Sequence, residues 1–386
     1  MYFALSEEQA ALDATVRSLL ERRSDGEAVR QALQSPRGHD PDLWATLCEQ
    51  IGAAALAIPE EYGGAGFSLF ETHVVLERLG YALTPSPLLG SAVLGAQAIL
   101  RSGSADACSR LLPDIAAGTT VAALAWAAPD GHWHPDRSGV RAANAGDGST
   151  LTGSAHLVLD GAHADVLLVV AVREDGRPGL YEVAPEGGGV RRTPMPGLDL
   201  TLRFARIDFQ AAPARPLCED AGVQLAELRD IAAVAVTALQ VGAAQRGLDM
   251  TVAYTKEREQ FGRPIGSFQA LKHRMADMLV HVETSRTLSW AAAWSAAQGS
   301  ADFGEKAAMA KAWCSDALNA VAAETVQLHG GIAITWEHDA QLLFKRAHAT
   351  SQLFGQPHEQ RRRLLAADRG KSRAGAGAAA AAPAPP

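Results

Sequence analysis

Two short motifs in the C-terminal half of the sequence carry residue types that suit a phosphate-bearing cofactor. One is R-E-Q-F-G at residues 258–262, and the other is Q-L-H-G-G at residues 327–331. Arg258 offers a planar guanidinium that can bind a pyrophosphate through paired hydrogen bonds. Phe261 offers an aromatic face, and Gly262 allows close approach of the backbone. An arginine near a helix end is, by itself, more often solvated or salt-bridged, so this motif alone leaves both interpretations open.

Histidines and cysteines add little further chemistry. The run His132-Trp133-His134 could bind a metal, but its Gly/Pro-rich surroundings offer no further spaced ligands, which favours an exposed loop and no metal site. His329 lies inside the second motif, where packing is favoured over acid–base work. The cysteines form no C-x-x-C pair, which predicts reduced, packed thiols. They are Cys48, Cys108, Cys218 and Cys314.

The composition excludes several classes of function. The chain has 386 residues, 47% of them hydrophobic, which is enough for two or three domains with a sizeable core. A net charge of -8 gives no indication of nucleic-acid binding. The N-terminus lacks the basic and apolar regions of a signal peptide, and the apolar stretch at residues 231–244 is shorter than the roughly 20 residues that span a bilayer. We therefore expect a cytoplasmic protein without a membrane segment.

The elements that must position the motifs follow from periodicity. Helical spacing and a good helix start at Ser6 predict an N-terminal helical domain over residues 1–120. Short apolar runs divided by Gly, Pro, Asp and Asn predict a small β-domain, barrel or sandwich, over residues 121–215. Long segments at 225–256, 268–298, 304–328 and 339–366 predict a four-helix bundle over residues 216–366. The Ala/Gly/Pro-rich remainder, 367–386, predicts a disordered tail.

The amino-acid sequences of several segments resemble those of the acyl-CoA dehydrogenase family. The resemblance covers nearly the whole chain up to about residue 365. P-E-E-Y-G-G-A-G at residues 59–66 and E-R-L-G at residues 77–80 are similar to its N-terminal helical domain, and the two cofactor motifs are similar to its C-terminal domain. The resemblance implies a mainly α fold with a central β-domain. It also implies FAD, which desaturates an acyl-CoA thioester when a carboxylate removes the α-proton.

Residues that would serve a neighbouring chain's FAD are kept. In the family, the matching residues reach across a subunit interface to the phosphates and adenosine side of the cofactor. By resemblance, the cofactor-binding residues are Arg258, Phe261, Gln269, Gln327, Gly330 and Gly331.

Residues that would serve this chain's own flavin ring differ from the family pattern. The loop at residues 125–132 keeps little more than the proline of T-E-P-x-A-G-S-D, with Ala127 near its start. Leu157 and Leu159 replace the tryptophan and threonine of W-I-T. Each polar flavin group left without a partner costs about 1 to 3 kcal/mol.

The family glutamate is absent from both of its usual positions, which are Phe354 and Ala232 here. Asp230 is the nearest acid to the second position. Two residues along a helix is a rotation of about 200°, so Asp230 faces the opposite side, where we expect a structural, capping role. The sequence therefore assigns no catalytic residue to this chain.

Three hypotheses follow. In the first, the chain is the non-catalytic subunit of a heteromeric dehydrogenase and resembles the α2β2 enzymes of actinobacterial steroid degradation. A partner chain then supplies the glutamate, and an electron-transfer flavoprotein accepts the electrons. The second is a homomeric flavoenzyme with Glu227 or Asp230 as an unrecognised base. The third is a flavin-free acyl-CoA-binding or scaffold protein, against which the retained Arg258 and Phe261 argue.

Overall fold

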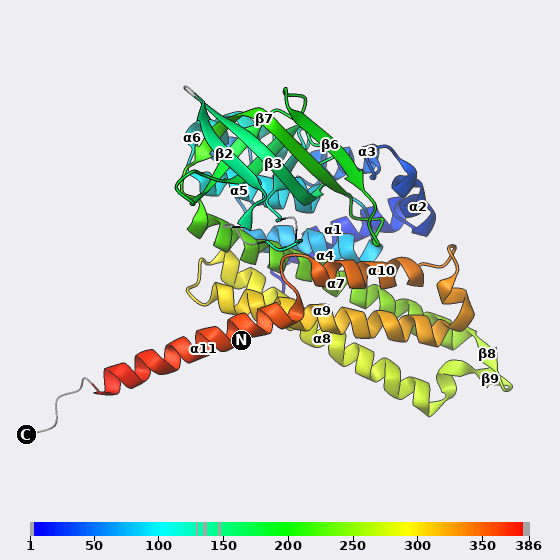
Figure 1. Ribbon diagram of the computed structural model, residues 1–386. Helices are drawn as coiled ribbons and strands as arrows, with labels where there is room; N and C mark the ends of the chain where they lie inside the picture. The colour runs from blue at the N-terminus through cyan, green and yellow to red at the C-terminus, as the bar shows by residue number, and fades with distance from the viewer. Residues whose placement is uncertain (1–3, 129, 134–136, 146–147, 381–386) are drawn as a thin grey trace, which may run out of the picture.

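The chain runs from N-terminal helices through a β-domain to long C-terminal helices, in the order that the sequence predicts. A computed structural model describes residues 4–128, 130–133, 137–145 and 148–380, with side chains described as far as residue 368. The β-domain lies on one side of the molecule, and the long C-terminal helices lie on the other (Figure 1). The predicted fold class, mainly α with a central β-domain, is confirmed.

The N-terminal helical domain begins where the capping signal predicts. The Ser6 hydroxyl accepts a hydrogen bond from the Gln9 amide, and the Gln9 side chain accepts one from the Ser6 amide, which together form a capping box. The helices are α1 (Glu7–Arg23), α2 (Gly26–Gln34), α3 (Pro41–Glu49), α4 (Leu69–Ala82), α5 (Ala96–Ser102) and α6 (Ala105–Ala116), with a short turn η1 (Glu60–Tyr62) and a π-helix η2 (Leu88–Gly95).

In the part of the β-domain that the structure describes, seven strands form one sheet. They are β1 (Ala122–Ala125), β2 (Val140–Ala145), β3 (Gly148–Leu159), β4 (Val166–Val172), β5 (Pro178–Val183), β6 (Val190–Met195) and β7 (Phe204–Cys218). Pairing runs β4–β2–β3–β7–β5 and returns from β5 to β4, so the sheet closes into a barrel, with β1 added beside β4 and β6 beside β7. Alternate side chains of these strands fill its interior, among them Leu151, Val169 and Phe209.

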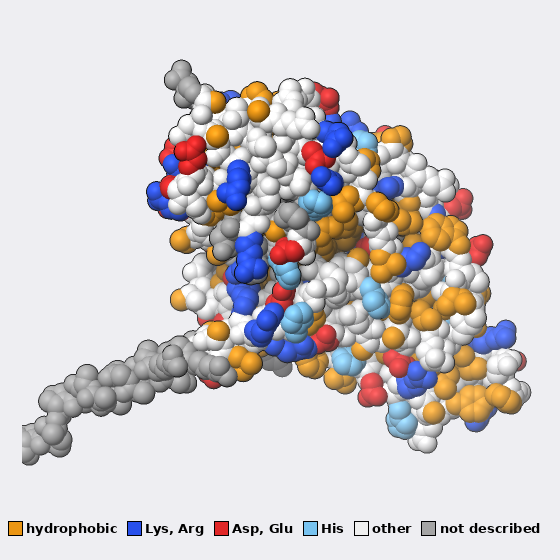
Figure 2. Space-filling view, viewed as in Figure 1, with side chains coloured by type: hydrophobic (Ala, Val, Ile, Leu, Met, Phe, Trp, Pro, Cys, Tyr) orange, Lys and Arg blue, Asp and Glu red, His pale blue; other side chains and the backbone are white. Residues whose placement is uncertain are grey.

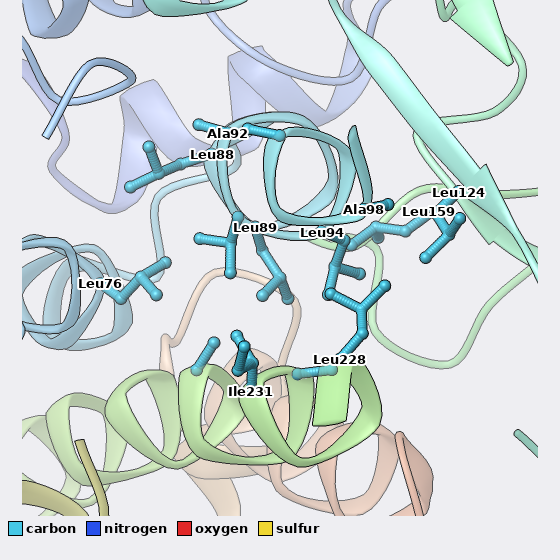
Figure 3. Packing of buried hydrophobic residues seen from close by; sticks show 14 of the residues in the cluster. Leu76, Leu88, Leu89, Ala92, Leu94, Ala98, Leu124, Leu159, Leu228 and Ile231 are labelled. Atoms are coloured by element: carbon cyan, nitrogen blue, oxygen red, sulfur yellow. The ribbon is translucent and has the colours of Figure 1, made fainter. Parts of the chain in front are cut away.

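A leucine-rich core joins the three parts of the chain. Around η2, Leu94 lies toward Leu124 of β1 and Leu159 of β3, whereas Leu88 lies on the side of Leu76 of α4 (Figure 3). Leu228 and Ile231 of α7 belong to the same cluster and lie on a third side of η2. All of these side chains are buried, so apolar packing fixes the angle between the barrel and the helices.

The C-terminal helices depart from the predicted four at one point. They are α7 (Gly222–Glu257), α8 (Gln269–Ala297), α9 (Phe303–His329), α10 (Ala340–Gln352) and α11 (Pro357–Ala380). The segment 339–366, predicted as one helix, is broken between α10 and α11. Phe354 and Gly355 have φ of 56° and 106° there, outside the helical region, and Pro357 can start a helix but not continue one.

The predicted disordered tail is wrong for residues 367–380, which continue α11, while residues 381–386 lie outside the described part of the chain. Alanine has the highest intrinsic helix propensity, so an alanine-rich run attached to an existing helix extends it without needing a buried face. Figure 1 shows α11 standing away from the body. Among the described helices, only α7 is long and apolar enough to cross a bilayer, and 89% of its most apolar window is buried.

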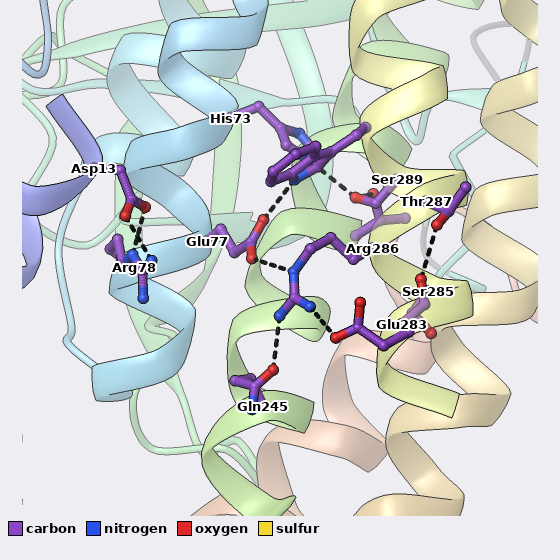
Figure 4. A network of polar contacts seen from close by, with 12 residues as sticks. Asp13, His73, Glu77, Arg78, Gln245, Glu283, Ser285, Arg286, Thr287 and Ser289 are labelled. Atoms are coloured by element: carbon purple, nitrogen blue, oxygen red, sulfur yellow. Dashed lines mark hydrogen bonds and ion pairs between the residues drawn. The ribbon is translucent and has the colours of Figure 1, made fainter. Parts of the chain in front are cut away.

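A polar network connects the N-terminal helices to the bundle (Figure 4). The Glu77 carboxylate of α4 accepts from Arg286 Nε at 3.1 Å and from Trp290 Nε1 at 2.8 Å, both on α8. Nearby, His73 Nε2 lies 2.9 Å from Ser289 Oγ. These contacts hold α4 against α8 and α7, which fixes the bundle that carries both cofactor motifs.

Candidate functional site

Phe354, which the sequence resemblance aligns with the family glutamate, belongs to an aromatic cluster. Phe354, in the turn between α10 and α11, is 3% exposed. Its ring centroid lies 5.2 Å from that of Trp133 and 5.8 Å from that of Trp126, both in the segment that follows β1. Aromatic contacts of this kind are stabilising beyond their buried area. The position therefore offers a packed hydrocarbon surface and no proton acceptor.

The sequence did not indicate this cluster. Trp126 lies within the loop at residues 125–132, and Trp133 follows it directly. Nothing in their spacing predicted a contact with Phe354, which lies more than 200 residues further along the chain. The two tryptophans in one loop were the available signal.

The other candidate acids are engaged in ion pairs. Asp230 lies in the third turn of α7, so it does not cap the helix as expected, and its carboxylate binds Arg363 of α11 at 2.7 and 2.9 Å. Burial raises the pKa of Asp230, while Arg363 and Arg229 act in the opposite direction. Glu227 pairs with Arg101 at 2.9 Å and is half exposed. The second glutamate position, Ala232, is completely buried.

A hollow of about 560 Å³ lies between the β-domain and α10. Figure 2 shows its hydrophobic floor. Leu157 projects from a bulge in β3, with φ of 50°, and lines the hollow beside Phe204 and Leu353. The facing loop, which contributes Leu198, is anchored by a fully buried ion pair between Asp199 and Arg346 Nε at 2.5 Å.

The remaining two ring-side positions do not face this hollow. Ala127 is buried and pairs with His156 through an isolated β-bridge, and Leu159 belongs to the leucine-rich core at η2. Neither side chain can donate a hydrogen bond, and of the three positions only Leu157 lines the hollow.

The two retained motifs come together at the other end of the bundle. Arg258 ends α7, and Phe261 stands 93% exposed at the tip of a hairpin formed by β8 (Glu259–Gln260) and β9 (Arg263–Pro264) (Figure 1). The Tyr254 ring of α7 stacks on His329 of α9 with centroids 4.5 Å apart, which brings residues 327–331 beside residues 258–262.

Every predicted cofactor-binding residue at this end is exposed. Gln269 begins α8, Gln327 lies on the outer side of α9, and Gly330 and Gly331 follow the end of α9. Within the described chain, the Arg258 guanidinium makes no hydrogen bond or ion pair. His329 is buried, and its Nδ1 contacts the Thr325 carbonyl at 2.7 Å, so it packs the motif from within, as predicted.

No metal site is found among the described residues, where no group of three or more potential ligands gathers, and His134 lies outside them. The cysteines are free thiols, of which Cys48, Cys108 and Cys314 are buried and Cys218 is half-buried.

Comparison with known proteins identifies the fold. Residues 6–119 match the acyl-CoA dehydrogenase N-terminal domain, and residues 223–368 match the acyl-CoA dehydrogenase C-terminal domain. "Acyl-CoA dehydrogenase IpdE2" of Mycolicibacterium smegmatis is 43% identical over 94% of this chain and 99% of its own. This chain belongs to the acyl-CoA dehydrogenase family.

Two solved structures extend the comparison. The ChsE4-ChsE5 complex from Mycobacterium tuberculosis superposes with a TM-score of 0.86 at 31% identity, covering 100% of both chains. A Tcur3481-Tcur3483 steroid ACAD variant superposes with a TM-score of 0.87 at 30% identity, covering 95% of this chain and 99% of that one.

Members of the family use FAD as the cofactor. Two regions of this chain are compared with it: the hollow beside Leu157, for the flavin ring, and the exposed motif at the far end of the bundle, for the phosphates and adenosine. At the ring side, Leu157 and Phe354 present hydrocarbon where a flavin needs hydrogen-bond partners and a base. At the far end, an unpaired guanidinium, an exposed phenyl ring and two exposed glycines suit the phosphates and adenosine of a dinucleotide. The chain's own ring site does not fit the cofactor, whereas its exposed motif does.

Proposed function

We propose that this chain is the non-catalytic subunit of a heteromeric, FAD-dependent acyl-CoA dehydrogenase. The observation that carries the proposal is the packing of Phe354 between Trp126 and Trp133. It fills the glutamate position with aromatic side chains, while the cofactor motif at the far end of the bundle stays exposed. A chain that has lost its own site but kept its contribution to a neighbour's is expected in a split enzyme.

The chain's contribution is binding and orientation. When bound in the partner, FAD accepts a hydride from the acyl-CoA β-carbon. Arg258 would bind the FAD pyrophosphate and Phe261 would cover its adenosine side, with Gln269, Gln327, Gly330 and Gly331 completing the contact. The partner would supply the base and the ring-binding loops, and an electron-transfer flavoprotein would accept the electrons.

A steroid-derived acyl group is the proposed substrate class. It rests on the similarity of this chain to the steroid ACAD variant and to the ChsE4-ChsE5 complex, both of which contain two named components. An α2β2 arrangement of two such chain types follows by the same analogy.

The FAD content of the assembled protein tests the proposal. The chain should be produced alone and together with a candidate partner that carries the family glutamate. We expect little flavin in the chain alone and about one FAD per two chains in the complex, counted from flavin absorbance and protein concentration. Stoichiometric FAD in the isolated chain would contradict the split site.

One observation favours a second candidate, a homomeric enzyme that uses Asp230. Burial raises the pKa of this carboxyl, as a general base often requires, and its neighbours Arg229 and Arg363 line the cavity that reaches Phe354. The ion pair with Arg363 opposes this role because Arg363 Nη2 donates to Asp230 Oδ2 at 2.9 Å and stabilises the ionised carboxylate.

A further inference from the structure

The exposed cofactor motif continues into a short segment, residues 330–336, that is held at both ends. It begins with the 3-10 turn η5 (Gly330–Ile334). At its start, Gly330 has φ of 67° and ψ of -145°, a backbone conformation that residues with a side chain rarely adopt. At its end, the Trp336 carbonyl accepts hydrogen bonds from Arg30 Nε at 3.0 Å and from Arg30 Nη2 at 2.9 Å. A side chain of α2, 306 positions earlier in the sequence, therefore fixes the end of the segment.

The Arg30 guanidinium uses all three of its nitrogens in this junction. Arg30 Nη1 donates to Asp339 Oδ1 and to the Gly26 carbonyl, both at 2.7 Å. The side chains of Arg30 and Asp339 are 15% and 20% exposed. Arg246 of α7 contacts the second Asp339 oxygen at 3.3 Å. A planar fork holds several partners in one geometry, so Arg30 fastens α2 to the stretch of chain that leads into α10 (Figure 1).

The glycine that begins α2 makes room for this contact. A Cβ atom at Gly26 would lie 2.6 Å from Asp339 Oδ1, which is closer than such atoms approach one another. The amides of the first helical turn also favour a carboxylate, because they form the positive end of the helix dipole. The position of Asp339 therefore depends on Gly26 as well as on Arg30.

The segment that is held in this way presents bare backbone to the outside. Gly331 does not have a positive φ, and a Cβ atom there would meet no described atom within 4 Å. Neither backbone strain nor packing within the described chain therefore requires a glycine at this position. Close approach of a ligand to the backbone from outside would require one.

We propose that Arg30 is a positioning residue for the contribution of this chain to the FAD site. By fixing Trp336 and Asp339, it keeps the Gly330–Gly331 backbone in the place where the partner's cofactor meets it. The inference rests on the proposed function, because it assumes that the exposed motif contacts FAD. The hydrogen bonds of Arg30 go to Gly26, Trp336 and Asp339, so Arg30 acts through the end of the segment and does not touch the cofactor.

Two variants loosen the segment in different ways. Arg30→Met removes all four hydrogen bonds of the guanidinium. Gly26→Ala leaves Arg30 unchanged and displaces the Asp339 carboxylate. In the full-length chain without flavin, both variants should speed amide hydrogen exchange in residues 330–336 and leave exchange in α8 unchanged. In the complex with the catalytic partner, both should speed FAD release by about three- to tenfold, measured by flavin fluorescence after dilution.

Arg23→Met is the matched control. Arg23, at the end of α1, also pairs with a carboxylate, that of Asp40 at 3.7 Å, but it makes no contact with residues 330–336. This variant should change neither the exchange of the segment nor the release of FAD. If Arg30→Met speeds FAD release while exchange rises equally in α8, or does not rise in residues 330–336, the positioning role is overturned, because release then follows a general loosening of the chain.

Arg258→Ala in the same complex separates the positioning role from the proposed function. If Arg258→Ala speeds FAD release but Arg30→Met and Gly26→Ala do not, the positioning role is wrong and the proposed function stands. If none of the three variants changes FAD release, the proposed function fails, and the positioning role fails with it. Faster release in all three variants, with faster exchange confined to residues 330–336 in Arg30→Met and Gly26→Ala, is the result that we expect.

Discussion

The Phe354 ring meets the Trp133 indole edge to face, with the two centroids 5.2 Å apart. This contact joins the turn between α10 and α11 to the segment after β1, so one side chain connects the helical bundle to the β-domain. Phe354 therefore has a structural role of its own.

Removal of this ring should destabilise the chain. Phe354→Ala leaves a cavity between two tryptophans, and we expect the free energy of unfolding to fall by about 3 to 5 kcal/mol. Urea unfolding followed by tryptophan fluorescence measures it. Phe344→Ala is the control, since Phe344 is a partly exposed aromatic residue on α10, and its loss should cost much less. If both variants lost the same free energy of unfolding, the contacts of Phe354 with the two tryptophans would add no stability beyond that of a partly exposed aromatic residue.

Restoring a glutamate should not restore a second active site. Phe354→Glu places a carboxylate against Trp126 and Trp133, where burial raises its pKa and destabilises the fold, and the ring-side positions still lack donors. In a complex whose partner has lost its glutamate, the variant should show no turnover. Recovered turnover together with a second equivalent of FAD would show that the ring site is intact.

The two acids on α7 separate the split enzyme from the homomer. If the chain is non-catalytic, Glu227→Gln and Asp230→Asn should leave turnover of the complex within a few-fold, whereas loss of a true general base costs about 100- to 10,000-fold. Flavin content and thermal melting must be measured alongside, because Asp230→Asn also removes the partner of Arg363. A large loss of turnover with flavin and folding unchanged would identify the altered acid as the base.

The exposed arginine should control flavin occupancy. Arg258→Ala is expected to lower the FAD content of the complex without unfolding the chain, since a charge-assisted bond to phosphate contributes roughly 1.5 to 3 kcal/mol. FAD release during dialysis measures the effect. Lys256→Ala, which removes an exposed cation from the same helix end, should leave occupancy unchanged. If the two variants behave alike, Arg258 is an ordinary surface residue.

Local signals in the sequence predicted the elements better than their junctions. Residues close together in the chain determine a helix cap, a short strand or a long helix. The structure has the Ser6 cap, the short strands of the β-domain and the long helices of the bundle where the sequence predicts them. The break at Phe354 was missed because helical periodicity continues on both sides of it, although Gly355 and Pro357 were available signals of a helix end and a new helix start. The aromatic cluster was missed because contacts between distant segments leave no periodic trace. Resemblance supplied the exposed cofactor residues, whose roles remain a proposal.

A buried amine in the bundle gives the last prediction. Lys311 of α9 is completely buried, and its Nζ donates to Ser315 Oγ at 2.9 Å and to the Ser351 carbonyl at 3.2 Å, with no carboxylate within ion-pair distance in the described structure. Burial lowers the pKa of Lys311 to about 7. The amine is therefore neutral in the folded chain at mildly alkaline pH, while the unfolded chain still holds the proton.

The sign of the pH dependence follows from this difference in bound protons. Between pH 7 and about 10.4, the unfolded chain binds one proton more at this site, so the Lys311 contribution to the free energy of unfolding rises with pH, by up to about 1.4 kcal/mol per unit. Cys314, whose pKa burial raises to about 12, acts in the opposite direction, since the unfolded thiol ionises first. Lys311→Met removes the lysine contribution and keeps the Cys314 thiol, so the difference between the two proteins reports Lys311 together with its smaller coupling to that thiol. Urea unfolding at pH 7, 8 and 9 should show the unchanged chain gaining stability relative to Lys311→Met at each step. A constant difference across these three pH values would show that the buried amine keeps its proton in the folded chain.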